Sequence, residues 1–291
     1  MNIYLDCIPC FIRQSLEAAQ IATEDVQMHE QVVRDVLRLT AELDLSKPPP
    51  WVVQLIYRKL RELTGNDDPY QAIKVKFNKL VLNLLPEIKG IIKQSSEPLV
   101  TAAKFAIAAN IIDLGVKSTL SETQISDALR ESVDVFVFGD WLNFRKKVST
   151  ARRILYLADN AGEIAIDRLL IEEIGPGRVT LAVRGKPVIN DATLIDAQEV
   201  GLRKLVEVID NGSDAPGTIL NDCSAEFREC FHEADLIISK GQGNFESLSE
   251  VDTNIFFLFK VKCPVIEKYI GLPLNKHVLL HSKDKQMKGR T

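Results

Sequence analysis

The hydrophobic pattern changes period near residue 150, and this change limits the possible folds of the chain more than any other feature. Before it, apolar residues recur at three- and four-residue spacing, which is typical of helices that bury one face. After it, short runs of β-branched and aromatic residues alternate with helical segments, which predicts βαβ units and a parallel sheet with right-handed crossovers. We therefore predict an α/β protein with a helical N-terminal domain at residues 1–130 and a domain built on a mainly parallel sheet at residues 131–291.

The individual elements follow from the same pattern. In the first part of the chain, the spacing predicts helices over residues 10–22, 29–43, 51–65, 68–94 and 98–115. In the second part it predicts strands over residues 152–159, 177–185, 205–212, 234–241, 254–261 and 277–282, with helices over 162–175, 191–201 and 224–233. The helix over 98–115 is apolar on most faces, so Asn110 and Asp113 are unexpected there.

Charge and composition argue against several classes of protein. The net charge is −4 and no run of five like charges occurs, so the basic stripe of a nucleic-acid binder is missing. The N-terminus has no basic region followed by an apolar stretch, and no window approaches 18 uncharged apolar residues, so neither a signal peptide nor a membrane span is expected. Five cysteines, an odd number, argue against a disulfide framework and favour the reducing cytoplasm.

Polar residues collect just after four consecutive predicted strands, at the edge where ligands bind in open parallel sheets. The first strand is followed by Asp159, Asn160 and Glu163, the second by Arg184, Lys186, Asn190 and Asp191, the third by Asp210, Asn211, Ser213 and Asp214, and the fourth by Lys240, Gly241, Gly243, Asn244 and Glu246. Carboxylate and amide oxygens beside cations and flexible backbone suit a hard divalent cation and a phosphate better than a thiolate or imidazole site.

Each of these groups also has a purely structural interpretation. Asn160 and Glu163 have the spacing of a helix capping box, and Asp191 can serve as a helix N-cap. Residues 241–246 have the pattern Gly-x-Gly-x-x-Glu, which lacks the third glycine of a dinucleotide-binding loop but suits an anion-binding loop. Residues 211–217 are typical of a mobile turn. Only the coincidence of all four groups at one sheet edge favours a functional site.

The chemistry that needs these residue types is metal-assisted phosphoryl hydrolysis. Asp159, Asn160 and Asp191 would supply oxygen ligands to the metal, and Lys240 with nearby backbone N–H groups would neutralise charge on the phosphoryl group. A carboxylate that is not bound to the metal would orient the attacking water, with Asp113 and Glu163 as the candidates.

These motifs resemble those of the damage-control phosphatases, a family of metal-dependent phosphatases long described as a domain of unknown function. The resemblance rests on the segments LADNAGE, RGKPVINDAT, DNGSDAPG and SKGQGNFE, preceded by AANIIDLG and by Cys7-Ile-Pro-Cys10. It runs from residue 6 to about residue 280, nearly the whole chain, and is strongest to the archaeal branch of the family.

The resemblance implies a helical N-terminal region packed against a Rossmann-like α/β/α domain. It also implies a phosphatase that depends on manganese, cobalt, nickel or magnesium and acts on small phosphorylated metabolites, such as sugar phosphates and damaged phosphometabolites. The family's metal ligands map onto Asp159, Asn160 and Asp191. Taken with the residues at the strand ends, the resemblance gives as catalytic candidates Asn110, Asp113, Glu163 and Lys240, and as substrate-binding candidates Arg184, Lys186, Ser213, Lys240, Gly241, Gly243, Asn244 and Glu246.

Two other functions are compatible with the pattern. A methyltransferase would need a glycine-rich first loop and an acidic residue at the end of the second strand, whereas the first loop has one glycine and the second strand ends in Arg184-Gly185. A non-catalytic binding module would bind metal tightly without turnover of any phosphate ester. Phosphatase activity that disappears with a chelator would separate these readings.

The cysteines and histidines give weaker signals. Cys7 and Cys10 supply only half of a tetrahedral zinc site, so structural, metal and redox roles stay open. The four histidines are scattered, and a surface or capping role is favoured over metal binding for each; they are His29, His232, His277 and His281. The sequence specifies no oligomeric state.

Overall fold

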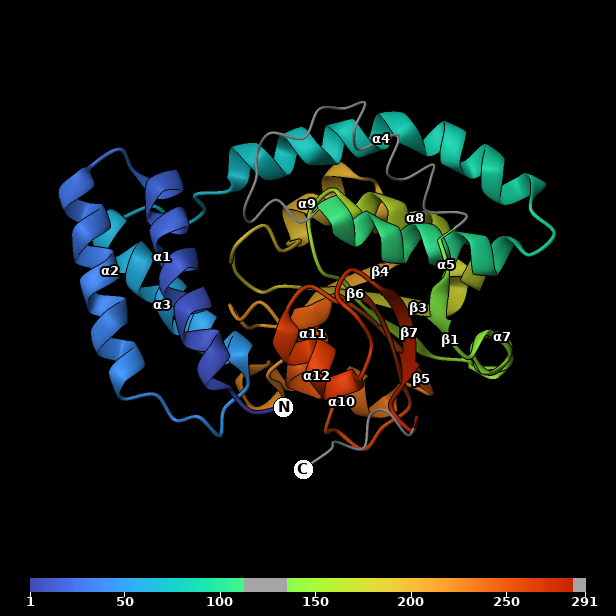
Figure 1. Ribbon diagram of the computed structural model, residues 1–291. Coiled ribbons are helices and arrows are strands. Elements are labelled where there is room, and N and C mark those ends of the chain that lie inside the picture. Colours follow the sequence, from blue (N-terminus) through green and yellow to red (C-terminus); the bar gives the residue numbers. More distant parts are fainter. Residues whose placement is uncertain (113–134, 285–291) are drawn as a thin grey trace.

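A seven-stranded sheet lies between two layers of helices, with a bundle of three further helices beside it (Figure 1). The computed structural model describes residues 1–112 and 135–284. Its chain order is helical at first and then alternates strands with helices, so the predicted α/β class, the helical N-terminal region and the mainly parallel sheet are confirmed.

The bundle consists of α1 (Ile8–Ala22), α2 (Val26–Ala41) and α3 (Pro49–Thr64). α3 begins at a proline, whose missing N–H needs no partner in the first turn of a helix, and ends at Gly65, whose φ of 65° is the left-handed conformation that terminates helices. The helices of the upper layer in Figure 1 are α4 (Gln71–Gln94), α5 (Pro98–Ala108), α8 (Glu163–Ile174) and α9 (Leu194–Glu199). A short 3-10 helix, Ala109–Ile112, continues α5.

The other α-helices within residues 1–112 and 135–284 are α7 (Trp141–Thr150), at one end of the sheet, and α10 (Ala225–Glu233), α11 (Gln242–Leu248) and α12 (Pro264–Ile270), which form the lower layer (Figure 1). The strands are β1 (Val137–Gly139), β2 (Ile154–Leu157), β3 (Val179–Val183), β4 (Glu207–Asp210), β5 (Leu236–Lys240), β6 (Ile255–Lys260) and β7 (His277–His281).

The strands lie in the order β1-β7-β6-β5-β2-β3-β4. Strands β2 to β6 are mutually parallel, whereas β7 is antiparallel to β6 and β1 is parallel to β7. Helices cover both faces of the parallel part, and β2 and β5 are buried at every position. This burial explains why these strands have continuous apolar sequences rather than an alternating pattern.

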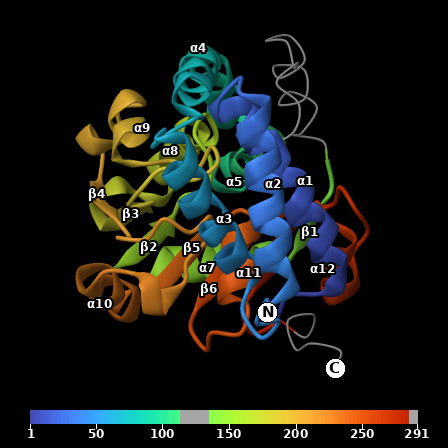
Figure 2. The same ribbon diagram turned by 90° about the vertical axis from the view of Figure 1, so that its left-hand side faces the viewer.

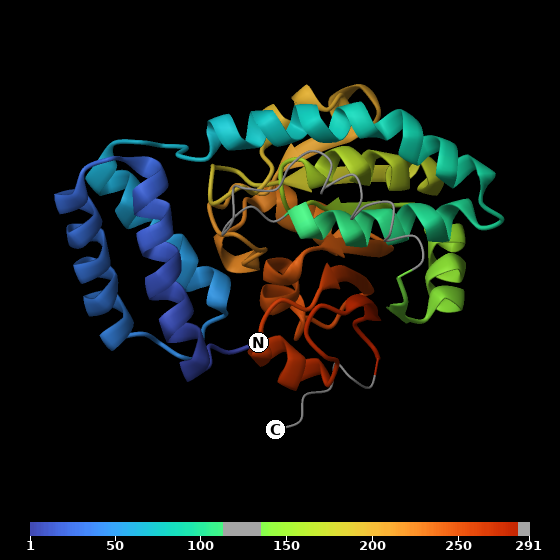
Figure 3. The same ribbon diagram turned by 45° about the horizontal axis from the view of Figure 1, so that its top comes forward.

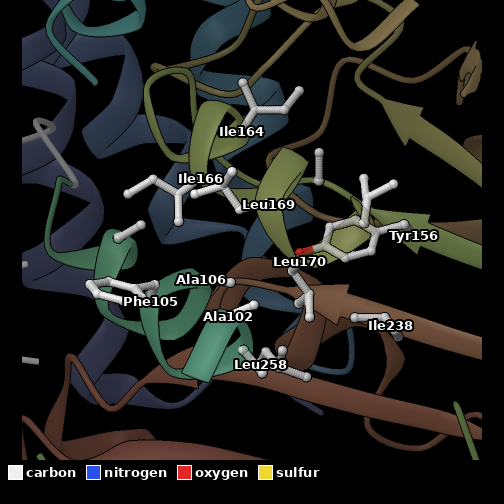
Figure 4. Packing of buried hydrophobic residues seen from close by; sticks show 14 of the residues in the cluster. Ala102, Phe105, Ala106, Tyr156, Ile164, Ile166, Leu169, Leu170, Ile238 and Leu258 are labelled. Carbon is white, nitrogen blue, oxygen red and sulfur yellow. The ribbon is translucent and has the colours of Figure 1, made fainter. Parts of the chain in front are cut away.

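The core between the sheet and the upper layer joins α5 and α8 to the central strands (Figure 4). Phe105 of α5, Leu170 of α8 and Tyr156 of β2 are each fully buried in this cluster. Ala102 and Ala106 keep one face of α5 flat, which lets the helix approach its neighbours closely. The short 3-10 helix that follows α5 and carries Asn110 packs against α8 and β6.

The α1–α3 bundle packs against the loops that follow β3 and β4, as the view onto the bundle in Figure 2 and the tilted view in Figure 3 show. Val188, in the loop after β3, belongs to the apolar core of the bundle. Asp214, in the loop after β4, accepts hydrogen bonds from Gln54 (2.6 Å), Arg58 (2.6 Å to Nη2) and Arg61, all in α3. The bundle is therefore attached to the carboxyl edge of the sheet.

The six predicted strands and the predicted helices are all present, apart from the part of the 98–115 helix that extends beyond the described residues. The sequence pattern does not predict β1, because three residues are too few for a period. His277 and His281 are buried in β7, so the surface or capping role expected for them is wrong. Among the described residues, none of the helices has the length and apolar character needed to cross a bilayer.

Candidate active site

The candidate site lies where the order of the strands reverses. The chain runs from β2 through β3 to β4 on one side and then returns to place β5 on the other side of β2. The carboxyl ends of β2 and β5 therefore flank a topological switch point, which is where doubly wound sheets bind ligands. Asp159 and Asn160 follow β2, Lys240 ends β5, and Asp191 is joined to Asn160 by an isolated antiparallel bridge. The structure thus brings together residues from three distant parts of the sequence.

The Asp159 carboxylate is buried, and its two oxygens have different surroundings. Oδ2 accepts hydrogen bonds from Asn110 Nδ2 and from Asn160 Nδ2, both at 2.9 Å. Oδ1 lies 3.9 Å from Nη2 of Arg184, which is too far for a hydrogen bond. Two donors therefore fix the orientation of the carboxylate through Oδ2 and leave Oδ1 for a ligand.

Glu163, the first residue of α8, is fully buried and orients the same two amides. Its Oε2 accepts hydrogen bonds from Asn110 Nδ2 at 2.9 Å and from Asn160 Nδ2 at 3.2 Å. Each amide thus uses its nitrogen for Glu163 and Asp159, and its oxygen is left for another partner. Asn110 Oδ1 is buried and has no hydrogen-bond partner within the ranges that the structure describes.

Lys240 is fully buried and is bound by two carboxylates. Its Nζ donates to Oε1 of Glu163 and, at 2.8 Å, to Oδ1 of Asp167, which also accepts a hydrogen bond from the Tyr156 hydroxyl at 2.7 Å. Burial alone would lower the pKa of Lys240, but Asp167 and Glu163 outweigh it and raise this pKa above its usual value. Burial raises the pKa of Asp167 to about 6 although Lys240 opposes the rise. Lys240 stays charged, and two of its three N–H donors are bound to carboxylates inside the protein.

Arg184 is anchored at three points in the interior. Its Nε donates to Asp191 at 2.6 Å, and its Nη1 donates to Oδ1 of Asn244 at 3.1 Å and to Oγ1 of Thr218 at 3.5 Å. Asn244 is itself held by the backbone oxygens of Ala158 and Lys240. The guanidinium is therefore fixed between Asp191 and Asp159, with Nη2 buried and lacking a hydrogen-bond partner in the described part of the chain.

Both capping interpretations of the site residues are wrong. The N-cap of α8 is Gly162, whose φ is 78°, and its N–H donates to Oδ1 of Asn78 in α4 at 2.7 Å. The Asn160 amide is occupied by carboxylates and does not cap the helix. The N-cap of α9 is Thr193, which forms a capping box with Asp196, so Asp191 is not a cap either. Helix capping therefore does not account for Asn160 and Asp191.

Two of the predicted substrate-binding residues adjoin this network. Gly241 lies against the Asp159 carboxylate, and Asn244 holds Arg184. Gly243 lies two residues further on, where the backbone oxygen of Pro216 leaves no room for a side chain.

Three other predicted substrate-binding residues lie outside this network of hydrogen bonds. Ser213 donates to Asp222 at 2.6 Å and accepts from the Ala215 N–H, which shapes its own loop. Lys186 is exposed, and Glu246 accepts a hydrogen bond from Gln242 at 2.8 Å. Burial raises the pKa of Glu246 to about 7. Asp113 lies outside the described residues.

Two charged residues of the site are absent from the sequence prediction. Asp167 lies four residues after Glu163 and hence on the same face of α8, a signal that the sequence contains. Lys262 follows β6 at the same sheet edge, and its backbone N–H donates to Oε1 of Gln242 at 3.0 Å, next to Gly241. Its charge opposes the rise in the pKa of Asp159. Extending the strand-end rule to the fifth predicted strand would have found it.

The fully or nearly buried charges of the site are out of balance. Four carboxylates face two cations: Asp159, Glu163, Asp167 and Asp191 against Arg184 and Lys240. Burial, followed by the nearby Glu163 and Asp191 carboxylates, raises the pKa of Asp159 well above its usual value. These groups leave two formal negative charges. The half-buried Lys262, whose charge also acts on Asp159, offsets part of this surplus, and a divalent cation would neutralise the rest.

The donor set is one of oxygens, not of thiols or imidazoles. The described residues contain no group of three or more His, Cys, Asp or Glu side chains that could hold a metal ion. A metal at this site must therefore take amide oxygens as well as the carboxylates of Asp159 and Asp191. The Asn160 amide, turned by its hydrogen bonds to Asp159 and Glu163, suits this role, as does the unpaired Asn110 Oδ1.

Comparisons with known proteins agree on one family. A model of the damage-control phosphatase ARMT1-like domain matches residues 3–278. The chain is 36% identical to an uncharacterized protein of Methanocaldococcus jannaschii, over 96% of this chain and 95% of that protein. It is 35% identical to the damage-control phosphatase PH1575 of Pyrococcus horikoshii, over 98% of this chain and all of that protein. The solved structure of PH1575, a DUF89 family protein, superposes with a TM-score of 0.87 at 33% identity and covers 97% of this chain.

Proposed function

Because this chain belongs to the damage-control phosphatase ARMT1-like domain family, we propose that it is a divalent-metal-dependent phosphatase of small phosphorylated metabolites. The proposed substrates are sugar phosphates or damaged phosphometabolites. The proposed metal is manganese, cobalt, nickel or magnesium, and the proposed location is the cytoplasm.

The observation that carries the proposal is the surplus of buried negative charge at the switch point. Burying an unbalanced charge is costly, and a bound cation removes this cost by restoring the balance. Asp159 Oδ1, the Asn160 amide oxygen and the Asp191 carboxylate would hold the metal. When bound, such an ion acts as a Lewis acid on a phosphoryl oxygen and lowers the pKa of water.

The chain's own residues would orient these ligands. Asn110 and Asn160 saturate Asp159 Oδ2, and Glu163 holds both amides from the other side, so neither ligand has to reorganise when a substrate arrives. Glu163 accepts hydrogen bonds at both oxygens, and this supports a positioning role for it rather than the orientation of water.

Two other cations are better placed than Lys240 to meet a phosphate. Lys240 would have to leave Glu163 and Asp167 in a fully buried environment. Arg184 has its unpaired Nη2 beside Asp159, and Lys262 lies at the same sheet edge in a half-buried position. We assign to these two residues the neutralisation of phosphoryl charge, and to Lys240 the role of an internal counter-ion.

The test is phosphate release by protein freed of metal and then supplied with manganese, cobalt, nickel or magnesium one at a time. A panel of sugar phosphates and p-nitrophenyl phosphate would serve as substrates. Activity should return with a metal, disappear with a chelator, and be lost in Asp159→Asn. Asp252→Asn, an exposed aspartate outside the site, is the matched control and should keep wild-type activity.

Tight metal binding by folded protein without hydrolysis of any ester would contradict the phosphatase. It would favour a non-catalytic binding module instead. Calorimetry on the same metal-free protein measures that binding independently of turnover.

A further inference from the structure

Asn190 is buried in a way that a purely structural role does not explain. Its side chain is 1% exposed, and within the described residues neither Oδ1 nor Nδ2 has a hydrogen-bond partner. A buried amide normally pairs both atoms, because an unpaired polar group loses the hydrogen bonds that water gives it in the unfolded chain. No other buried amide in the described ranges has both atoms unpaired.

The backbone next to Asn190 is strained. Ile189 has a φ of 46°, a left-handed conformation that residues branched at Cβ rarely adopt. A tight turn closes around it, since the Asp191 N–H donates to the oxygen of Val188 at 3.0 Å. Strain of this kind persists where the surrounding structure enforces it, and it collects at ligand sites.

The strained turn delivers Asn190 to the proposed active site. The backbone oxygen of Asn190 accepts a hydrogen bond from the Ala161 N–H at 2.8 Å, and the Ala192 N–H donates to the backbone oxygen of Asp159 at 2.8 Å. Residues 190–192 therefore run alongside residues 159–161. Asn190 is next to one proposed metal ligand in sequence and is paired through its backbone with the segment that carries the other two.

The unpaired atoms around this segment are of two kinds. Arg184 Nη2 and Asn190 Nδ2 are buried donors, whereas Asn110 Oδ1 and Asn190 Oδ1 are buried acceptors. Phosphoryl oxygens accept hydrogen bonds, and hydroxyl groups donate them. A phosphate monoester that carries a hydroxyl close to its phosphate supplies partners for both kinds.

We propose that Asn190 is a substrate-contacting residue that is held buried and unpaired until substrate binds. Its Nδ2 donates to a phosphoryl oxygen, and its Oδ1 accepts from a hydroxyl of the same substrate. This assignment rests on the proposed function and narrows its substrates to hydroxylated phosphate monoesters. It also means that Asn190 destabilises the ligand-free protein.

The experiment compares Asn190→Leu with Asn211→Leu. Asn211 is buried to the same 1%, but its Oδ1 accepts hydrogen bonds from the N–H groups of Gly185 and Ser213, both at 3.0 Å. In metal-free, ligand-free protein, Asn190→Leu should raise the melting temperature by about 2 to 4 °C, whereas Asn211→Leu should lower it. With manganese present, Asn190→Leu should weaken the binding of inorganic phosphate at least about tenfold by calorimetry.

A lower melting temperature for Asn190→Leu, or phosphate affinity equal to that of the wild type, would overturn the assignment. If Asn190→Leu does not fold, phosphate affinity can be measured on Asn190→Ala instead. Phosphate affinity equal to that of the wild type in Asn190→Ala would also overturn the assignment. Failure of the proposed function is a separate outcome. If the wild type hydrolyses no ester but Asn190→Leu is more stable and loses phosphate binding, the phosphatase is refuted and the assignment of Asn190 to phosphate binding holds.

Discussion

The α-carbon of Gly241 lies against the carboxylate of Asp159. A Cβ built on Gly241 would come 2.0 Å from Oδ2 and 2.5 Å from Oδ1, and the φ of Gly241 is 80°. The residue that turns the chain from β5 into α11 therefore also forms one wall of the space around the Asp159 carboxylate. A side chain at this position is excluded by contact and by backbone conformation together.

Gly241→Ala should abolish the site while leaving the fold largely intact. Because the added methyl group must displace Asp159, we expect metal affinity to fall and activity to drop by about two orders of magnitude or more. Gly271→Ala is the matched control, since Gly271 has a φ of 72° but open space around its Cβ position. It should cost about 1 kcal/mol of stability and leave activity unchanged. Equal activity losses in the two variants would show that the contact with Asp159 is unimportant.

Lys240→Met should destabilise the protein strongly. The substitution leaves Glu163 and Asp167 buried without their cation, a change that typically costs about 3–5 kcal/mol. Urea unfolding followed by circular dichroism measures the effect. Lys260→Met is the control, because Lys260 is half-buried and its pKa is lowered by burial and by Lys262. This substitution should change the free energy of unfolding very little. A stable Lys240→Met variant that lost only phosphate affinity would mean that Lys240 contacts the substrate.

Asp214→Ala should loosen the α1–α3 bundle from the sheet. Gln54, Arg58 and Arg61 of α3 all donate to this buried carboxylate. Its removal takes the nearest carboxylate from both arginines and leaves Arg58 only the 3.6 Å contact with Asp222. We expect a loss of about 2–3 kcal/mol and faster amide hydrogen exchange in α1–α3 than in β2 or β5. Glu30→Ala, which removes an exposed ion pair with Arg34, should have no measurable effect. Uniform exchange across the whole chain would contradict a separate opening of the bundle.

The stability of the protein should fall in acid partly because of His277. Burial, with help from the paired Lys260, lowers the pKa of His277 to about 4 from a usual value of 6.5. Between pH 6.5 and pH 4, His277 binds a proton in the unfolded chain but not in the folded chain. The contribution of neutral His277 to the free energy of unfolding is therefore complete above pH 6.5 and is lost as the pH falls toward 4. His277→Gln should reduce the difference in unfolding free energy between pH 7 and pH 4 by about 3 kcal/mol. Parallel pH profiles for variant and wild type would show that His277 does not titrate in this way.

Local pattern was sufficient for most of the fold. The strands at 154–157 and 236–240 are buried on both faces, and their continuous apolar sequences identify them without knowledge of their neighbours. β1 is missed because its three residues are too few to show a period, and its pairing with β7, about 140 positions later, leaves no local signal. The rule that ligand-binding residues lie at strand ends predicted that Asp159, Asn160, Asp191 and Lys240 lie close together, and the structure places their segments side by side.

The details of the site depend on contacts that no local pattern contains. Asn78 of α4 accepts the hydrogen bond from the N–H of Gly162, the N-cap of α8. Arg184 turns inward because Thr218 and Asn244 accept its hydrogen bonds. Lys240 is bound in the interior because Asp167, one helical turn after Glu163, completes its environment. In each case a partner that is distant in sequence decides which of two reasonable roles a polar residue takes.

The site is assembled from residues 110, 159–163, 184–191 and 240–244, and none of these segments holds the others in place alone. A chain that has emerged only as far as β4 has the carboxylates of the first two strand ends but lacks Lys240, Gly241 and Asn244. Whatever binds at the switch point therefore recognises only the completed fold, and its binding energy adds to the stability of the whole domain. Under the proposed function, the metal ion would stabilise only chains that have been synthesised and folded completely. It would not stabilise chains that end before β5.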